Sequence, residues 1–414
     1  MKELLPKISF YTLLLLVASI PTFRSFSPIL IVLFAVTSIA HGIINKSFQI
    51  TNKKVFIAGI AFFLIHLISV IYSEHKDVAW FDIEVKLSLL VFPLLFSIKN
   101  KYITKNSKYI FITFSTLTII ANIYLLSTSI YNTEIIDIWN MTRDETWNFS
   151  SSNLSQYIHP SYLSMYNLFV VAYLIIQIIN GKEIKRFLLI IPSSFLLIEI
   201  FLLQSKAGFI ALAAVLVYIT FLLYLRIKNK LLKIALPIII LAISGYTISQ
   251  NYRMQMMFKS LVEIVKTGDS KSSSTGARFE IWKATLNVVG RNPLLGVGAG
   301  DIKPKMYEEY DKIKTNSEEV EENHYNVHNQ FLETMLGQGL IGFGLLIFLL
   351  FAGLQQAYKN KDNLLAMFIF IIILNFFPES MLNQQAGVVF FTFFFYLFTL
   401  TLNKKSSNNQ TQTL

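Results

Sequence analysis

The chain has 414 residues, of which 54% are hydrophobic and 15% charged, and its mean hydropathy is +0.53. A soluble domain of this length does not have such a composition, whereas a polytopic membrane protein does. The chain contains no cysteine, so disulfides, thiolate metal sites and cysteine nucleophiles are excluded. The net charge of +11 does not indicate a nucleic-acid partner, because the lysines fall in short segments between apolar runs.

Apolar runs recur along the whole chain, and a helix needs about 20 such residues to cross the hydrocarbon core. Lys2 and Lys7 precede the first run as in a signal peptide, but no clear small-x-small cleavage site follows, so we expect an uncleaved first helix. The predicted spans are 4–20, 28–45, 55–72, 78–97, 109–130, 159–179, 187–203, 207–225, 232–249, 331–357, 363–378 and 386–402. The sequence therefore predicts an all-α polytopic membrane protein with about twelve transmembrane helices.

Lysine and arginine are concentrated in alternate loops, which sets the expected orientation. If both termini are cytoplasmic, most of the loop cations lie on that side, as the positive-inside rule requires. The short outer segments then contain only Arg24, Lys76, Arg143 and Lys206. We therefore expect an even number of spans with both termini on the cytoplasmic side.

Two outer segments, about 131–158 and 250–330, are too long to be ordinary connections, and loops of that length are usually functional. The expected organisation is nine transmembrane helices within 1–249, an extracytoplasmic helical loop over 250–330, three further transmembrane helices within 331–402 and a disordered cytoplasmic tail at 403–414. The sequence contains no internal repeat and nothing that resembles a nucleotide-binding domain.

The 250–330 loop divides into a basic half, 250–305, and an acidic half, 306–329. Such a division is either an ordinary solvated surface or a basic region that faces an anionic substrate near the membrane. A helix is expected after the small, polar stretch Ser270–Gly276. Its shared face would hold Phe279, Trp282, Leu286 and Val289, and Gly290 and Pro293 would end it.

Arg278 would lie in the first turn of that helix if Thr275 is its N-cap. A helix amino terminus offers free N–H groups and a positive dipole end, and an arginine fork there suits a phosphate or diphosphate. The alternative is an ordinary surface charge. Trp282 lies on the same face one turn later and is expected to anchor the helix at the membrane interface.

The glycine-rich run Gly296–Gly300 lacks the strand and helix of a dinucleotide fingerprint, so we interpret it as a tight turn at the membrane surface. Pro304 is expected to prevent a long helix soon after Asp301. His328 stands where the polar loop ends and a membrane helix begins. It is either a simple cap or a general base of near-neutral pKa, and the polar Glu333 in the first turns of that helix suggests a cavity beside it.

Three motifs in this order resemble the O-antigen ligase and O-antigen polymerase superfamily. They are Thr275-Gly276-Ala277-Arg278 with Trp282, Asn292-Pro293-Leu294-Leu295-Gly296-Val297-Gly298-Ala299-Gly300-Asp301, and His328-Asn329-Gln330-Phe331-Leu332. A large outer loop before the last three spans resembles that superfamily too. The sequence-specific part of the resemblance covers about 275–340.

The resemblance implies a GT-C-like glycosyltransferase of the bacterial inner membrane, with its active site on the periplasmic side. It implies a donor glycan carried on undecaprenyl diphosphate, no nucleotide sugar or cofactor and, for the ligases, no required metal. It implies that Arg278 binds the donor diphosphate and that His328 deprotonates or orients the acceptor hydroxyl. Ligases of the family transfer the glycan to lipid A-core or to protein, and polymerases join repeat units. The expected partners are the lipid-linked donor, a lipid A-core or glycan acceptor and membrane lipids, with no nucleic acid.

Further substrate-binding residues are predicted around these two. Lys206 stands where the family often has an arginine, and it keeps the charge without the bidentate fork; Glu199 is its expected partner, and a snorkelling lysine is the alternative. His159 opens the span 159–179 at the outer face. The remaining candidates are Arg143, Asn329 and Arg291, while Asp82 and Lys86 are expected to form a structural pair.

The favoured function is an inverting, ligase-type glycosyltransferase, with a repeat-unit polymerase as the alternative within the family. A transporter with charged residues along a path is the rival from another class. Missing repeats, few charges inside the spans and a very long outer loop argue against it. A non-catalytic assembly partner, which would need neither Arg278 nor His328, is the third possibility.

Overall fold

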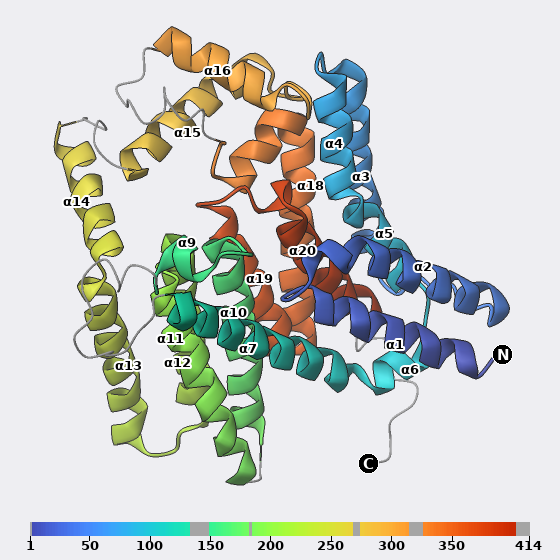
Figure 1. Cartoon of the computed structure of the whole chain (residues 1–414), viewed down its shortest axis with the longest axis vertical. Coiled ribbons are helices and arrows are strands. Elements are labelled where there is room, and N and C mark those ends of the chain that lie inside the picture. Colours follow the sequence, from blue (N-terminus) through green and yellow to red (C-terminus); the bar gives the residue numbers. More distant parts are fainter. Residues whose placement is uncertain (1, 133–148, 182–183, 268–273, 314–325, 403–414) are drawn as a thin grey trace.

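The computed structural model describes residues 2–132, 149–181, 184–267, 274–313 and 326–402. These residues form helices and no strand, which confirms the predicted all-α class; a single antiparallel bridge pairs Phe48 with Ile98. Figure 1 shows a bundle of long helices with the shorter helices α15 and α16 over one end.

The first part of the chain supplies α1 (Leu4–Ser19), α2 (Ser27–Ile44), α3 (Lys53–Tyr72), α4 (Lys76–Lys86), α5 (Ser88–Phe96), α6 (Lys101–Lys105) and α7 (Ser107–Asn132). The middle supplies α9 (Ser151–Leu154), α10 (Pro160–Asn180), α11 (Ile190–Leu202), α12 (Lys206–Arg226) and α13 (Lys230–Gln250). Short 3₁₀ turns at Arg24–Phe26 and Ile184–Leu189 precede α2 and α11.

The long outer loop folds as α14 (Tyr252–Thr267), α15 (Ser274–Arg291) and α16 (Ile302–Ile313). The chain then forms α18 (Gln330–Asn360), α19 (Asn363–Phe376), a 3₁₀ turn at Met381–Asn383 and α20 (Gln385–Tyr396), which ends in a π-helical turn at Leu397–Thr401.

Helices lie at every predicted span, two of them at 78–97. Within the described residues, six helices are long and apolar enough to cross a membrane: Arg24–Ile44, Lys53–Tyr72, Ser107–Asn132, Pro160–Asn180, Lys206–Arg226 and Gln330–Asn360. Shorter apolar helices cover Leu4–Ser19, Asn363–Phe376 and Gln385–Thr401. These features agree with a polytopic membrane protein. The number of crossings and their orientation stay predictions.

The predicted span 78–97 is not one helix, because the helix is interrupted at Leu87, between α4 and α5. The Leu87 N–H donates to the Glu84 carbonyl, which tightens the last turn of α4. Of the two helices, α4 is the polar one. It contains the predicted structural pair, in which the Lys86 ammonium contacts the Asp82 carboxylate. A helix with these charges is a poor membrane span, and only α5 is strongly apolar.

A cluster of phenylalanines forms the core where α7, α10, α19 and α20 meet. Phe114, Phe169, Phe368, Phe390 and Phe394 are all fully or almost fully buried there. The Phe169 and Phe394 ring centroids are 4.7 Å apart in an edge-to-face arrangement, which suits aromatic quadrupoles. Of the candidate spans, α10 is the most enclosed, with 78% of its apolar window buried.

A kink in α18 holds the outer loop on the bundle. Gly339 leaves the helical conformation (φ 64°, ψ −165°), which frees the carbonyls of Leu336 and Gly337. They accept hydrogen bonds from the Val297 and Gly298 N–H groups at 2.8 and 3.0 Å. The glycine-rich run is therefore the tight turn that the sequence predicts, and it packs on this kink.

The structure corrects the expectation for Pro304. A 12-residue helix, α16, begins at Ile302 and includes Pro304 in its first turn. Proline is tolerated there because the first N–H groups of a helix have no intrahelical acceptor. The Asp301 carboxylate, just before this helix, accepts hydrogen bonds from the N–H groups of Glu74 and His75 at 2.7 and 3.0 Å, which ties the loop to α4.

Candidate active site at the end of the bundle

The backbone at the start of α18 turns sharply and presents the His328 side chain. His328 has φ 49°, a left-handed conformation that costs a residue with a β-carbon about 1–3 kcal/mol. Asn329 then caps α18, because its side-chain oxygen accepts from the N–H groups of Phe331 and Leu332 at 2.9 and 3.0 Å. Such strain persists only when neighbouring contacts enforce it.

The outer-loop helix α15 supplies one of these contacts. The Trp282 indole N–H donates to the Val327 carbonyl at 3.1 Å, next to His328. Trp282 is therefore a brace between two parts of the protein. Its expected place at the membrane interface stays a prediction. The brace couples the position of α15, and so of Arg278, to that of His328.

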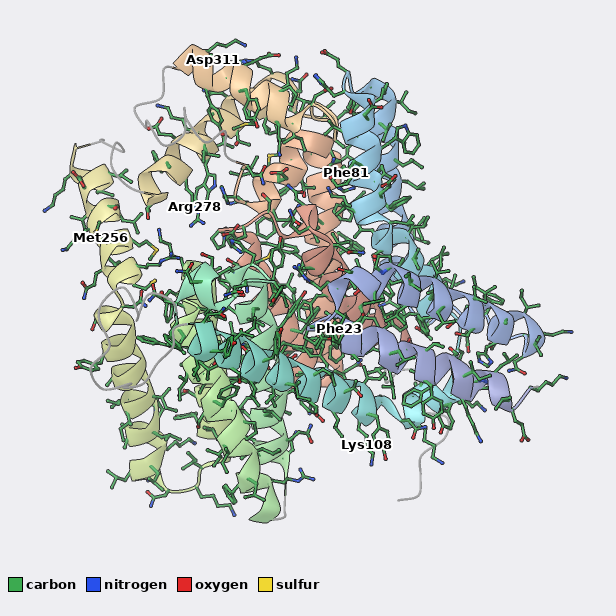
Figure 2. All side chains as sticks on the ribbon, viewed as in Figure 1. Phe23, Phe81, Lys108, Met256, Arg278 and Asp311 are labelled. Atoms are coloured by element: carbon green, nitrogen blue, oxygen red, sulfur yellow. The ribbon has the colours of Figure 1, made fainter. Side chains whose placement is uncertain are left out.

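The register of α15 also differs from the prediction. Its buried residues include Ala277, Ile281, Ala284 and Val288. Of the predicted face, Val289 is buried and Trp282 is partly buried, whereas Phe279 and Leu286 are about half exposed. The helix begins at Ser274, so Thr275 is not its N-cap, and Arg278 lies just beyond the first turn. Figure 2 shows the Arg278 side chain projecting from α15 toward the bundle.

The segment between α19 and α20 lies against the first turns of α18. Glu333, which we expected to face a cavity, accepts hydrogen bonds from the Ser380 hydroxyl at 3.1 Å and the Asn383 amide at 2.7 Å. The Leu382 N–H donates to the Gln330 side chain at 2.6 Å. This network satisfies the buried carboxylate of Glu333 and holds Glu379, the residue before Ser380, beneath His328.

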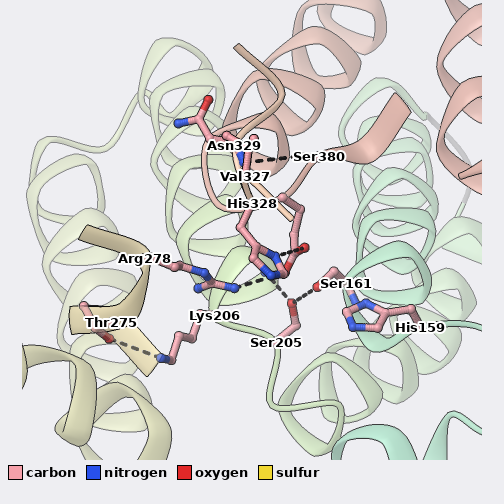
Figure 3. Close-up of polar contacts among 12 residues, drawn as sticks. His159, Ser161, Ser205, Lys206, Thr275, Arg278, Val327, His328, Asn329 and Ser380 are labelled. Atoms are coloured by element: carbon pink, nitrogen blue, oxygen red, sulfur yellow. Dashed lines mark hydrogen bonds and ion pairs between the residues drawn. The ribbon is translucent and has the colours of Figure 1, made fainter. Parts of the chain in front are cut away.

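Glu379 joins the two residues that the sequence predicts to be catalytic. One of its carboxylate oxygens lies 3.2 Å from an Arg278 guanidinium nitrogen, and the other lies 3.3 Å from His328 Nδ1 (Figure 3). Burial acts to raise the pKa of Glu379, but the His328 hydrogen bond and the nearby charges of Arg278, His328 and His159 outweigh it. The pKa of Glu379 is consequently below its usual value, and the carboxylate stays ionised.

Lys206, at the start of α12, contacts α15, the helix that carries Arg278. Ser205 caps α12 by accepting from the Gly208 N–H at 3.1 Å, and Lys206 follows as the first helical residue. The Lys206 ammonium donates to the Thr275 hydroxyl at 3.2 Å, on the first turn of α15. The expected pairing with Glu199 is not formed, because both Glu199 carboxylate oxygens are buried without a hydrogen-bond partner.

His159 and Arg253 complete the group. His159 caps α10 through its ring, with Nδ1 accepting from the Ser161 N–H at 3.3 Å. Burial lowers the pKa of His159; the Glu379 carboxylate opposes this shift, and the cations His328, Arg278 and Arg253 add to it. The Arg253 guanidinium lies 3.5 Å from the Gln204 carbonyl, in the turn before Lys206.

Two predicted substrate-binding residues, Asn329 and Arg291, are not brought to this group. Figure 3 shows the Asn329 side chain pointing away from Arg278 and His328, toward the helix end that it caps. Arg291 lies at the opposite end of α15 from Arg278, with its guanidinium 2.7 Å from the Glu309 carboxylate on α16. Arg143 lies outside the described residues, as does the acidic run 318–322.

Two residues of the group, Glu379 and Arg253, are absent from the predicted site. Glu379 had a sequence signal, because it is the only charged residue between Asp362 and Lys404. A carboxylate between two apolar runs is costly in a membrane protein and usually marks a functional position. Arg253 had none, since it is one of many cations in the basic half of the outer loop.

The arrangement can bind an anion and move a proton. Arg278 on α15, Lys206 on α12 and Arg253 on α14 supply positive charge from three different elements. The charges of Arg278, Arg253 and the Glu379 carboxylate all act on the pKa of His159. A histidine that donates Nδ1–H to a carboxylate has its lone pair on Nε2, the arrangement that general bases use. In the part of the chain that the structure describes, no cluster of side chains suits a metal ion.

The fold and the site together define the class of protein. It is an all-helical membrane protein with a cationic, histidine-containing site at one end of its helix bundle. Residues 191–349 match the O-antigen ligase family model. The match includes Lys206, Arg278 and His328 and ends before Glu379. The superfamily resemblance predicted from the motifs is thereby confirmed.

Two curated relatives support this conclusion. An uncharacterized protein of Haemophilus influenzae is 26% identical over 203 residues, which cover 45% of this chain and 50% of the relative. A ComP-specific O-oligosaccharyltransferase of Acinetobacter baylyi is 26% identical over 246 residues, which cover 58% of this chain and 42% of the relative. The matches thus span half or less of the length of these relatives.

Proposed function

We propose that the protein transfers a glycan from an undecaprenyl-diphosphate carrier to an acceptor hydroxyl at the outer face of the bacterial inner membrane. The observation that carries the proposal is the Glu379 carboxylate, which contacts both Arg278 and His328. This contact sets an anion-binding group beside a proton acceptor, as transfer from a diphosphate donor requires. The O-antigen ligase domain supports a lipid-linked glycan as the substrate class.

The cations bind the donor diphosphate in this mechanism. Arg278 presents a planar fork with five N–H donors, of which one contacts Glu379 and the others remain for phosphate oxygens. Lys206, joined to the same helix turn through Thr275, provides a point charge next to that fork. These charges stabilise the diphosphate as it leaves with the electron pair of the broken glycosidic bond.

His328 acts on the acceptor. Glu379 accepts from Nδ1–H, so Nε2 takes the proton of the acceptor hydroxyl while its oxygen attacks the anomeric carbon. The new carbon–oxygen bond forms on the face opposite the departing diphosphate, which inverts the anomeric centre. No metal ion enters this mechanism, because the cationic side chains carry the charge stabilisation.

The acceptor defines the biological role. We favour a ligase, which transfers an assembled glycan to lipid A-core or a similar acceptor. The relative named ComP-specific O-oligosaccharyltransferase is consistent with an oligosaccharide as the transferred group. A repeat-unit polymerase would use the same donor chemistry with a second lipid-linked glycan as the acceptor.

The lipid-linked glycan pool in cells tests this proposal. We would compare wild type, a deletion and Arg278→Ala/His328→Ala at matched expression, with Lys283→Ala as the control because it removes an exposed cation from the same helix. A ligase predicts long lipid-linked chains and loss of surface glycan in the deletion and the double variant, whereas Lys283→Ala behaves as wild type.

A polymerase instead predicts that single repeat units accumulate on the carrier. An unchanged pool and unchanged surface glycan in both the deletion and the double variant would contradict the glycosyltransferase and favour a transporter. With purified protein, full transfer by His328→Ala would exclude the role assigned to that histidine.

A further inference from the structure

A second group of cations, Lys46, Lys99 and Lys101, lies at the end of the bundle away from His328. The Asn52 amide donates to the Gln356 side chain at 3.0 Å, which places the loop before α3 near the far end of α18. Gln356 follows His328 by more than seven helical turns, about 40 Å along a helix. This second group is therefore separate from the transfer site.

A polar cavity of about 510 Å³ opens at this end, between the end of α2, the start of α1 and α6. Figure 1 shows these three elements gathered beside the N terminus. The polar side chains of its lining include His41, Asn45, Lys46, Ser47, Lys99 and Lys101. None of its three lysines forms an ion pair with a carboxylate in the described parts of the chain. The cavity is therefore strongly cationic.

Backbone hydrogen bonds between two loops form the wall of this cavity. The Gln49 N–H donates to Ser97 O at 2.9 Å, and the Lys99 N–H donates to Ser47 O at 2.8 Å. The buried His41 ring lies beneath them, with Nδ1 2.6 Å from the Asn45 amide nitrogen and Nε2 3.3 Å from the Lys99 carbonyl oxygen. These contacts hold the backbone of the two loops that carry the lysines in place without a ligand. The entropic cost of binding is therefore lower.

Lys46 occupies a position that favours glycine. It follows the C-cap of α2 with φ 52°, the left-handed conformation in which glycine usually ends a helix. A lysine there bears a backbone penalty that glycine would avoid. The residue nevertheless supplies one of the unpaired charges of the cavity, and function is a common reason for such strain.

An apolar cavity of about 700 Å³ adjoins the polar one and shares Phe48 and Gln49 with it. Its apolar lining comes from α2, α3 and α5, including Ala35, Ile39, Phe56, Val91, Leu94 and Leu95. Phe48, between the two cavities, is 58% exposed although it is large and apolar. A continuous surface thus changes from cationic to apolar within the length of one side chain.

We propose that the two cavities together bind one anionic glycerophospholipid of the bilayer. Its phosphate would lie among Lys46, Lys99 and Lys101, and an acyl chain would lie across Phe48 in the apolar cavity. Charge complementarity selects the head group, because basic pockets between membrane helices attract anionic lipids. The adjoining apolar surface selects a lipid over a free phosphate, which could occupy only the polar half.

Lipid titration of the full-length purified protein, followed by native mass spectrometry, tests this site. The probes are dioleoylphosphatidylglycerol, zwitterionic dioleoylphosphatidylcholine and the deacylated head group glycerophosphoglycerol. Lys46→Gly removes a charge and suits the left-handed backbone, so it should fold at least as well as wild type. Lys361→Gly is the matched control: it is exposed, also has positive φ (51°) and lines neither cavity.

We expect wild type and Lys361→Gly to retain phosphatidylglycerol in preference to phosphatidylcholine. Lys46→Gly combined with Lys101→Gln should weaken phosphatidylglycerol binding about thirtyfold, given two lost surface charges. Equal retention of both lipids by wild type would overturn the proposal, and so would an equal loss in Lys361→Gly. Competition by glycerophosphoglycerol as strong as by the intact lipid would show a simple anion site and also overturn it.

Discussion

At the scale of single residues, the Glu379 carboxylate contacts two groups with different tasks. Arg278 needs its fork oriented for phosphate oxygens, and His328 needs its Nδ1 proton held so that Nε2 can act as the base. One ionised carboxylate serves both needs. A glutamine of the same shape would keep the packing but would hold neither the charge of Arg278 nor the tautomer of His328.

We therefore predict that Glu379→Gln lowers kcat about 100-fold, the range typical of impaired general-base catalysis, with a smaller change in KM for the donor. Steady-state kinetics with a purified lipid-linked donor measure both. Glu309→Gln is the control, because Glu309 is also buried against an arginine, Arg291, but lies away from the site. A kcat loss as large in Glu309→Gln would mean that Glu379 acts only through stability.

The pH dependence of stability provides an independent measurement. The pKa of Glu379 is lowered in the folded protein, so its ion pairs stabilise the fold above the pKa of an unfolded glutamate. That contribution is lost as pH falls through the lowered folded pKa. The difference in Tm between wild type and Glu379→Gln should be constant near neutral pH and shrink in acid. A difference that grows in acid would contradict the assignment.

Lys206 gives a further prediction. Lys206→Arg restores a bidentate fork beside Arg278 and should retain or improve kcat/KM for the donor, whereas Lys206→Gln should raise the donor KM about tenfold because a charge-assisted hydrogen bond is lost. Lys228→Gln, in the exposed loop after α12, should leave both constants unchanged. If Lys206→Gln matches wild type, the lysine is a snorkelling residue and takes no part in donor binding.

At the scale of elements, the contact between the glycine turn and the α18 kink positions the outer loop. Gly296 has φ 72°, and a β-carbon there would lie 2.4 Å from the Leu336 carbonyl oxygen. Gly290, near the end of α15, has no heavy atom within 4 Å of such a carbon. Glycine is therefore required at position 296 but not at position 290.

Gly296→Ala should destabilise the protein by about 1–3 kcal/mol through backbone strain and the clash with α18. Gly290→Ala should be neutral or stabilise it by up to about 1 kcal/mol, since alanine is the better helix residue. Thermal unfolding in detergent measures both. Equal effects of the two substitutions would show that the turn does not hold the loop.

The helix α15 shows the limit of periodicity. The sequence predicts its existence and its end correctly, but of the expected face of Phe279, Trp282, Leu286 and Val289 only Val289 is fully buried and Trp282 is partly buried. Small residues such as Ala277 and Ala284 pack against the neighbouring elements, while Phe279 and Leu286 remain half exposed. Hydrophobicity ranks large side chains first, but close packing between helices favours small ones, so the pattern alone misplaces the face.

At the scale of the whole molecule, orientation in the membrane rests on the positions of the lysines. The absence of cysteine makes this orientation directly measurable, because a single introduced thiol has no background. Lys283→Cys on the outer loop should react with a membrane-impermeant maleimide in spheroplasts, whereas Lys361→Cys, between α18 and α19, should react only after permeabilisation. Both positions are exposed. Reaction of Lys361→Cys in intact spheroplasts would contradict the cytoplasmic assignment of that loop.

The sequence by itself determined the helical class and the positions of the apolar helices, and it predicted four residues of the candidate site: Arg278, His328, Lys206 and His159. These follow from local properties: composition, runs of apolar residues, and motifs whose residues are close along the chain. Only the tertiary structure decided that Glu379 joins Arg278 and His328, that Arg253 and His159 stand beside them, and that Asn329 and Arg291 serve caps and ion pairs elsewhere. Those contacts depend on how α10, α14, α15 and α18 pack, and packing brings together residues that no spacing along the chain relates.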